Sequence, residues 1–289
     1  MTRFWSIAFS VLAIGFFAVL LAIFAVQSVP AWQHAGTGYV TGSRWFFRTH
    51  EFGALPMIYG TIAVSGVAIL LAAPVGLASA IFTAEYLPRK ARLAVKVLIE
   101  LLAGIPSVIY GLLGILLLRN WIYDLFARFD ISSGDTLLTA GVLLAVMILP
   151  TVVTLSDDAL RGVPRSQRNA ARSLGLTQAE TIFAVSLRQS ARGLMSALLL
   201  GLGRALGETI AVFLVVGRQD NNLPKHWLSL SPLLESGQTL TSKLGGSETN
   251  IAYGDPLHWA AMVGLGLLLL VIVSATTIAG VWKKAGGDA

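Results

Sequence analysis

Cysteine is absent from this chain of 289 residues, and charged side chains make up only 12% of it. The first absence excludes a disulfide framework and any metal site built from thiolates. The second excludes an ordinary soluble domain, in which about a quarter of the residues are charged. Instead, 55% of the residues are hydrophobic and the mean hydropathy is +0.73. The composition therefore predicts an integral membrane protein.

Several patterns that carry chemistry are also missing. No glycine directly precedes a lysine, so the chain lacks the G-x-x-x-x-G-K-[ST] loop that binds ATP phosphates. It has no H-E-x-x-H, and its four histidines fall outside or at the edges of the apolar runs. Ser107 suggests an intramembrane serine hydrolase, but no histidine or lysine lies at bilayer depth to activate it, which favours a packing role. We expect no catalytic residue, metal or cofactor.

Six apolar runs are present, and each reaches the roughly 20 residues that a membrane-spanning helix needs. They cover about residues 4–27, 55–85, 97–118, 136–156, 193–217 and 257–282. The first follows Arg3 as in a signal peptide. It is longer than the usual signal-peptide core of about 7–15 residues, and no A-x-A site follows it, so we expect a retained anchor. The sequence predicts an all-α membrane protein with six transmembrane helices.

The distribution of lysine and arginine predicts the orientation of these helices, because cytoplasmic loops are enriched in both. Thirteen of these residues fall in segments 1–3, 86–96, 157–192 and 283–289. Seven fall in the alternate segments 28–54, 119–135 and 218–256. Both termini are therefore expected in the cytoplasm. The net charge of +6 and the pI near 9.8 then reflect topology, and we expect no binding to nucleic acid.

The cytoplasmic segment 157–192 contains a stretch, NAARSLGLTQAETI at 169–182, that predicts a helix, a stop and a second helix. Gly175 suits the left-handed position that ends a helix. Thr177 and Glu180 form a T-x-x-E capping box that starts the next one. Two short helices at a bend would make a compact projection on the cytoplasmic face. The alternative is a simple connector between two spans.

The fifth apolar run, LLLGLGRALGETIAVFLVVG at 198–217, carries Arg204 and Glu208 at membrane depth. Four residues apart on one helix, they would share a face, and Gly203 with Gly207 would let a neighbouring helix approach closely. The pair either holds helices together or forms a polar path. Ionisable groups in a membrane generally mark pathways, and the arginine fork suits an oxyanion. We favour the path.

Four stretches of the sequence give the chain a recognisable resemblance. The stretch AARSLGLTQAETIFAVSLRQSARGL at 170–194 resembles the cytoplasmic loop by which ABC importer permeases dock into their ATPase. FGALPMIYGT (52–61), ELLAGIPSVIYG (100–111) and GRALGETIAV (203–212) resemble the membrane subunits of bacterial high-affinity phosphate importers. The ending IAVFLVVG is more similar to the first of the two permease subunits. Asn169 departs from the family, which has a glutamate there.

The resemblance implies an ABC importer permease fold, with an anchor helix and outer segment at 1–54 and a transmembrane domain at 55–283 whose coupling loop is 157–192. It implies a multi-pass protein of the bacterial inner membrane that works with a second homologous permease, an ABC ATPase dimer and an extracytoplasmic phosphate-binding protein. ATP would be hydrolysed in the separate ATPase. The implied phosphate route contains Arg204, Glu208, Thr209 and Ser107. The implied ATPase contacts are Ala170, Ala171, Leu174, Gly175, Thr177 and Glu180.

Two alternatives stay open on the sequence alone. One is an ABC permease for another oxyanion, such as phosphonate, sulfate or molybdate. The other is a membrane-embedded enzyme acting on lipid, which would need an acid–base or metal cluster that the sequence does not contain.

Overall fold

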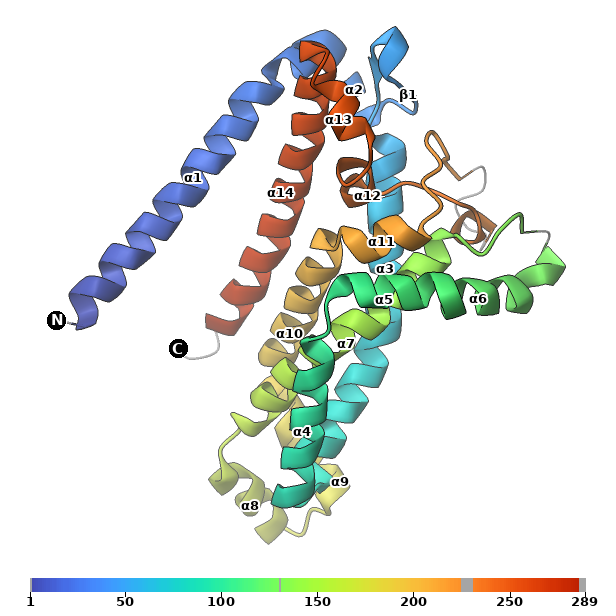
Figure 1. The fold of residues 1–289 in the computed structure, drawn as a ribbon. Coiled ribbons are helices and arrows are strands. Elements are labelled where there is room, and N and C mark those ends of the chain that lie inside the picture. Colours follow the sequence, from blue (N-terminus) through green and yellow to red (C-terminus); the bar gives the residue numbers. More distant parts are fainter. Residues whose placement is uncertain (1, 130, 225–230, 286–289) are drawn as a thin grey trace.

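The computed structural model describes residues 2–129, 131–224 and 231–285, and nearly all of its regular structure is helical (Figure 1). The expected all-α class is confirmed. The helices are α1 (Thr2–Ala35), α2 (Gly38–Thr41), α3 (Leu55–Ile81), α4 (Arg89–Ala103), α5 (Ser107–Leu113), α6 (Arg119–Phe126), α7 (Leu137–Arg161), α8 (Arg165–Ser173), α9 (Gln178–Thr181), α10 (Leu187–Gly207), α11 (Ile210–Val215), α12 (Leu240–Leu244), α13 (Glu248–Ala252) and α14 (Pro256–Ala285). The strands are β1 (Trp45–Phe46) and β2 (Glu51–Phe52). Short 3-10 turns are η1 (Phe47–Thr49), η4 (Ala127–Phe129) and η6 (Ser231–Leu234), and π-helical turns are η2 (Phe82–Tyr86), η3 (Gly114–Leu118) and η5 (Ile182–Ser186).

Five helical stretches of the described residues are long and apolar enough to cross a bilayer. They are Phe4–Ala35, Leu55–Tyr86, Ser107–Phe129, Leu137–Arg161 and Pro256–Trp282. Six were expected, and the apolar run at 193–217 has no counterpart among the five. That run is divided between the end of α10 and the short α11. The chain is thus a multi-pass membrane protein, and the count of six helices is not confirmed.

The third expected span, 97–118, is not one helix. α4 ends at Ala103, and Pro106 has an extended ψ of 139°, so a new helix starts at Ser107. Proline lacks the amide hydrogen that would continue the helical ladder. Tyr110 spans the break, because its hydroxyl donates to the carbonyl of Leu102 over 2.8 Å. In Figure 1, α4 runs along the bundle, whereas α5 and α6 turn across it.

α3, α7 and α10 form the centre of the bundle, where small residues bring the helices close together. A Cβ added at Gly141 of α7 would lie 2.6 Å from Val67 of α3. One added at Gly76 of α3 would lie 2.7 Å from Val152 of α7, which also contacts Gly201 of α10. These distances are too short for a larger residue. Close backbone approach is the main source of helix association within lipid, where the hydrophobic effect between helices is weak.

At one end of the bundle, the hairpin β1–β2, α2, α12 and α13 pack together as a cap around buried Lys243 (Figure 1). The Lys243 ammonium donates to Asp220 at 2.8 Å and pairs with Glu248. Burial alone would raise the pKa of Glu248, but Lys243, Trp45 and His258 donate to its carboxylate and hold the pKa below its usual value. The segments expected as outer loops, 28–54 and 218–256, are therefore folded structure where they are described.

Candidate functional site

The fifth apolar run breaks between Arg204 and Glu208. α10 ends at Gly207, Glu208 has an extended ψ of 121°, and α11 starts at Ile210. The expectation that Arg204 and Glu208 share one helix face is therefore wrong. The described residues contain no ion pair between them. A membrane helix can break where its freed backbone groups find partners within the protein, and no proline marked this break in the sequence.

Arg204 lies in the last turn of α10 and is exposed on the surface of this chain. Its guanidinium donates to the hydroxyl of Thr151 on α7 over 2.8 Å. One hydrogen bond engages a single N–H of the five that the guanidinium offers. Arg204 is thus aimed by α7 while most of its donors stay available on an open face. This arrangement supports anion binding better than the pairing of two charges between packed helices.

The other expected route residues lie around the break. A carboxylate oxygen of Glu208 accepts from the backbone N–H of Ala211 at 3.3 Å, so this side chain supports the start of α11. Half-buried Thr209 lies against the cap, since a Cβ added at Gly245 would meet its methyl group at 2.8 Å. Half-buried Ser107 begins α5, the helix that packs on α11.

The two glycines expected to bring a neighbouring helix close behave differently. A Cβ added at Gly203 would lie 3.1 Å from the Thr277 hydroxyl of α14, so the close approach occurs there. The same test at Gly207 finds no atom within 4 Å. Only the first glycine of the G-x-x-x-G spacing therefore lies at a close helix contact, because α10 ends at the second.

At the opposite end from the cap, α8, the turn through Gly175 and α9 form a projection that we call the knob (residues 165–181). Gly175 has φ +89°, the left-handed conformation expected for it. Thr177 accepts from the Glu180 backbone N–H, and the Glu180 carboxylate accepts from the Thr177 backbone N–H at 2.8 Å, so the expected capping box is confirmed. Hydrogen bonds from the backbone and the hydroxyl of Thr177 hold the pKa of Glu180 below its usual value. α9 does not end as a separate helix but continues through η5 into α10.

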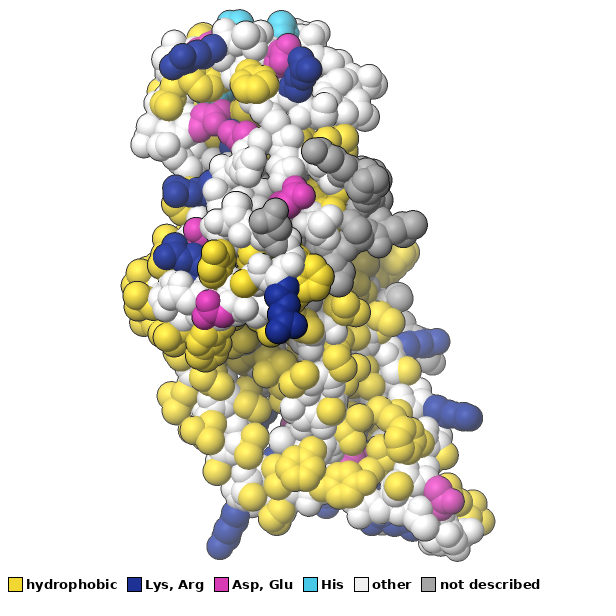
Figure 2. Space-filling model, turned by 90° about the vertical axis from the view of Figure 1, so that its right-hand side faces the viewer, with side chains coloured by type: hydrophobic (Ala, Val, Ile, Leu, Met, Phe, Trp, Pro, Cys, Tyr) yellow, Lys and Arg dark blue, Asp and Glu magenta, His cyan; other side chains and the backbone are white. Residues whose placement is uncertain are grey.

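The expected ATPase-contact residues divide between the inside and the outside of the knob. Ala171 is buried, whereas Ala170, Gly175, Thr177 and Glu180 are exposed. Leu174 is 82% exposed, and Phe183 nearby in the chain is 69% exposed. Figure 2 shows hydrophobic side chains spread over much of the surface from the middle of the molecule down toward this end. An apolar side chain so exposed at a tip beyond the spanning helices is suited to contact another protein.

A nearly buried ion pair, which the sequence analysis missed, joins the knob to the bundle. Arg168 of α8 lies 3.2 Å from the carboxylate of Glu85, and their side chains are 15% and 4% exposed. Arg168 also donates to the carbonyl of Leu160 at the end of α7, and Gln178 of α9 donates to the carbonyl of Glu85 at 2.9 Å. These contacts link the knob to η2, which follows α3 directly, and to the end of α7. No local pattern reveals them, because Glu85 and Arg168 are far apart in the sequence.

No group of three or more His, Cys, Asp or Glu residues that could hold a metal ion occurs in the described part of the chain. The arrangement therefore consists of an arginine on an open helix face near a break in the bundle and, at one end, a capped projection tied to two central helices. His226 and Lys225 lie outside the described residues.

Comparisons with known proteins agree with this arrangement. Residues 72–282 match the family described as "Binding-protein-dependent transport system inner membrane component". The phosphate transport system permease protein PstC of Mesorhizobium japonicum is 36% identical over 270 residues, which cover 88% of this chain and 80% of the relative. PstC 1 of Mycobacterium tuberculosis is 35% identical over 79% of this chain and 71% of its own length. The expected resemblance to this group of permeases is confirmed.

A solved structure supports the fold separately. The MetNI methionine ABC transporter in an inward-facing conformation contains a chain that matches with a TM-score of 0.57 at 20% identity. The match covers 79% of this chain and 94% of that one. The family model and the relatives, which match most of its length, show that the chain belongs to the family of binding-protein-dependent transport system inner membrane components.

Proposed function

We propose that this chain is the membrane-spanning permease of an ATP-driven phosphate importer of the bacterial inner membrane. The observation that carries the proposal is Arg204, held by Thr151 on an open face at the break in α10–α11. The names of the relatives at 35–36% identity support phosphate as the substrate. A planar guanidinium binds phosphate oxygens through paired, charge-assisted hydrogen bonds.

The proposed complex contains a second, homologous permease, two copies of an ABC ATPase and an extracytoplasmic phosphate-binding protein. Because this chain lacks a phosphate-binding loop for ATP, hydrolysis takes place in the ATPase subunits. The knob faces the cytoplasm and docks into the ATPase through Leu174 and its exposed neighbours. The cap faces outward and receives the loaded binding protein. Both termini are cytoplasmic in this arrangement, as the excess of basic residues on that side predicts.

The route residues divide the work of passing an anion through the bilayer. Arg204 supplies the charge that offsets the loss of water around the phosphate, which is expensive at membrane depth. Thr209 and Ser107 add hydroxyl groups near the break. Glu208 holds the start of α11 and keeps the break open. Movement of the knob is transmitted to the helices of the route through Arg168 and Gln178. These two residues connect the knob to α7 and to the turn that follows α3.

The test is uptake by the assembled transporter, captured through a tag on this chain and reconstituted with its binding protein. We expect ATP-dependent uptake of radiolabelled phosphate that excess sulfate, molybdate or phosphonate does not inhibit. If one of these anions inhibited uptake as strongly as unlabelled phosphate does, the assignment of phosphate as the specific substrate would be wrong. Capture without an ABC ATPase or a second permease would overturn the importer itself.

A further inference from the structure

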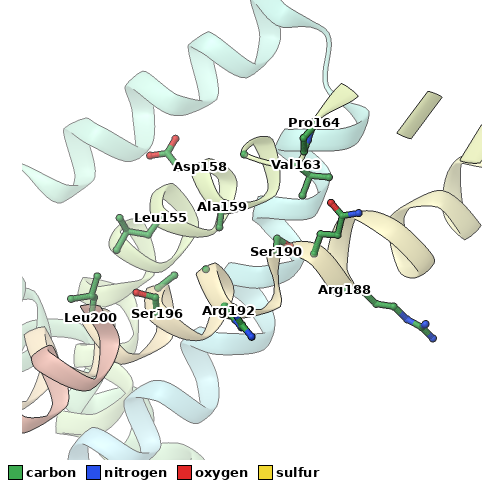
Figure 3. Close-up of a pocket in the computed structure, with 14 residues that line it drawn as sticks. Leu155, Asp158, Ala159, Val163, Pro164, Arg188, Ser190, Arg192, Ser196 and Leu200 are labelled. Atoms are coloured by element: carbon green, nitrogen blue, oxygen red, sulfur yellow. The ribbon is translucent and has the colours of Figure 1, made fainter. Parts of the chain in front are cut away.

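Two hydroxyl groups lie near Arg204, and they come from different helices. Thr151 of α7 accepts from the guanidinium, and the Tyr110 hydroxyl of α5 lies close enough for the charge of Arg204 to act on it. A cavity of about 600 Å³ also opens between α7 and α10, with Leu155 and Leu200 at its end deeper in the bundle (Figure 3). Neither Arg204 nor Thr151 lines this cavity. Helices α5 and α7 therefore contribute polar groups beside Arg204, and the cavity does not reach it.

Tyr110 donates to a backbone carbonyl that has lost its regular helical partner. In a continuous helix, the carbonyl of Leu102 would accept from the backbone N–H four residues later, but that position is Pro106, which has no amide hydrogen. The Tyr110 hydroxyl donates to this carbonyl over 2.8 Å. The backbone N–H of Ile105 also donates to it, over a longer 3.3 Å. Tyr110 therefore supplies the shorter hydrogen bond and spans the break between α4 and α5.

Beyond the two breaks, α5 and α11 are packed tightly against each other. A Cβ added at Gly111 of α5 would lie 2.5 Å from Leu214 of α11. One added at Gly114, directly after α5, would lie 2.8 Å from Val215 of α11. Tyr110 is 8% exposed and belongs to the same core cluster as Val215. α5 and α11 thus form one packed unit, which is joined to α4 at one break and to α10 at the other.

We propose that Tyr110 is a positioning residue of the phosphate route, whose hydrogen bond to the Leu102 carbonyl holds the unit of α5 and α11 in place beside Arg204. The inference rests on the proposed function and adds a residue that acts through Leu102 rather than on phosphate. α11 starts directly after the break that follows Arg204. A shift of α5 against α4 therefore moves both the start of α11 and the Ser107 hydroxyl.

The first variant is Tyr110→Phe, which removes the hydroxyl, keeps the ring in the core and should leave assembly unchanged. We expect the maximal rate of phosphate uptake by the reconstituted transporter to fall about fivefold, the factor that corresponds to one hydrogen bond of ordinary strength. ATP hydrolysis stimulated by the loaded binding protein should fall much less, because the knob is unaltered. More ATP is then hydrolysed for each phosphate carried.

A transporter that is merely destabilised would lose uptake and ATP hydrolysis in proportion, and this result in Tyr110→Phe would overturn the positioning role. The matched control is Tyr123→Phe, which removes an exposed hydroxyl in α6. It should change neither uptake nor ATP hydrolysis.

A second variant separates support of the fold from positioning of the route. Alanine at position 106 has the amide hydrogen that proline lacks, so Pro106→Ala with Tyr110→Phe gives the Leu102 carbonyl a donor again. We expect this double variant to recover the thermal stability that Tyr110→Phe loses. It should not recover uptake, because a continuous ladder favours a straight helix in place of the break. Recovery of uptake would show that Tyr110 only satisfies a carbonyl and would overturn the positioning role.

Thiol labelling at the start of α5 gives a readout that does not depend on phosphate. Because this chain has no cysteine, Ser107→Cys with cysteine-free partner subunits places one thiol at the break. Adding Tyr110→Phe should raise its rate of labelling severalfold, since the half-buried position opens more often, and adding Tyr123→Phe should not. Absence of phosphate uptake by the unmodified transporter would refute the proposed function. With that uptake present, an unchanged labelling rate or normal uptake in Tyr110→Phe would refute the positioning role alone.

Discussion

The bend at Gly175 gives the sharpest test of coupling through the knob. Gly175 has φ +89°, and a Cβ added there would meet no atom within 4 Å. A side chain at this position would therefore strain the backbone without clashing with neighbours. A residue other than glycine in a left-handed conformation costs about 1–2 kcal/mol, and a β-branched residue is more strongly disfavoured. We expect Gly175→Val to lower the population of the bent knob roughly tenfold, since about 1.4 kcal/mol corresponds to that factor.

The assay is ATP hydrolysis by the reconstituted transporter, stimulated by the loaded binding protein, measured beside phosphate uptake. We expect Gly175→Val to insert and assemble but to lose most of the stimulation. Gly175→Asn is the matched variant, because asparagine tolerates the left-handed region better than other residues do, and it should keep most of the activity. Full stimulation in a well-assembled Gly175→Val transporter would show that the bend is not needed for coupling.

Three further predictions concern the contacts and the orientation. Glu85→Ala should lower the thermal stability of the complex more than the double variant Glu85→Ala with Arg168→Met does. The single change leaves the nearly buried charge of Arg168 unpaired, at a cost of about 3 kcal/mol. Equal losses of stability in the two variants would contradict the pairing. A membrane-impermeant thiol reagent on intact cells should label Ser236→Cys and spare Ser166→Cys, and the reverse pattern would overturn the orientation. Because the pKa of Glu248 is lowered in the folded protein, its carboxylate stabilises the cap at pH values above the ordinary glutamate pKa. This stabilisation is lost as the pH falls through the lowered pKa. Melting curves should therefore show an acid-induced loss of thermal stability that is absent in Glu248→Gln. An unchanged pH dependence of the melting temperature in that variant would refute this role of Glu248.

The parts of the site that were predicted correctly depend on residues close together in the sequence. Gly175, Thr177 and Glu180 lie within six positions, and their side chains decide the local backbone through a left-handed turn and two hydrogen bonds. The apolar runs likewise predicted most of the long helices, because lipid requires about 20 apolar residues per crossing. Local chemistry was sufficient for these features.

The features that the sequence analysis missed depend on distant partners. The break at Glu208 has no proline, and it is supported by contacts of Thr209 with the cap and of Glu208 with α11. The buried pair of Glu85 with Arg168 joins residues that only the folded bundle brings together. A period of 3.6 residues continued through GRALGET and therefore predicted an unbroken helix. Tertiary contacts overrode that local preference.

The most direct test of the account is phosphate uptake by transporters with altered Arg204. Arg204→Lys keeps the charge but removes the planar fork, and Arg204→Met with Glu208→Leu removes both charges. Arg128→Lys, at an exposed arginine away from the route, is the control. A charge-assisted hydrogen bond contributes about 1.5–3 kcal/mol, so we expect uptake to fall roughly 10- to 100-fold in both route variants while assembly with the ATPase is unchanged. Wild-type uptake by the assembled double variant would contradict the account and leave Arg204 with only a packing role.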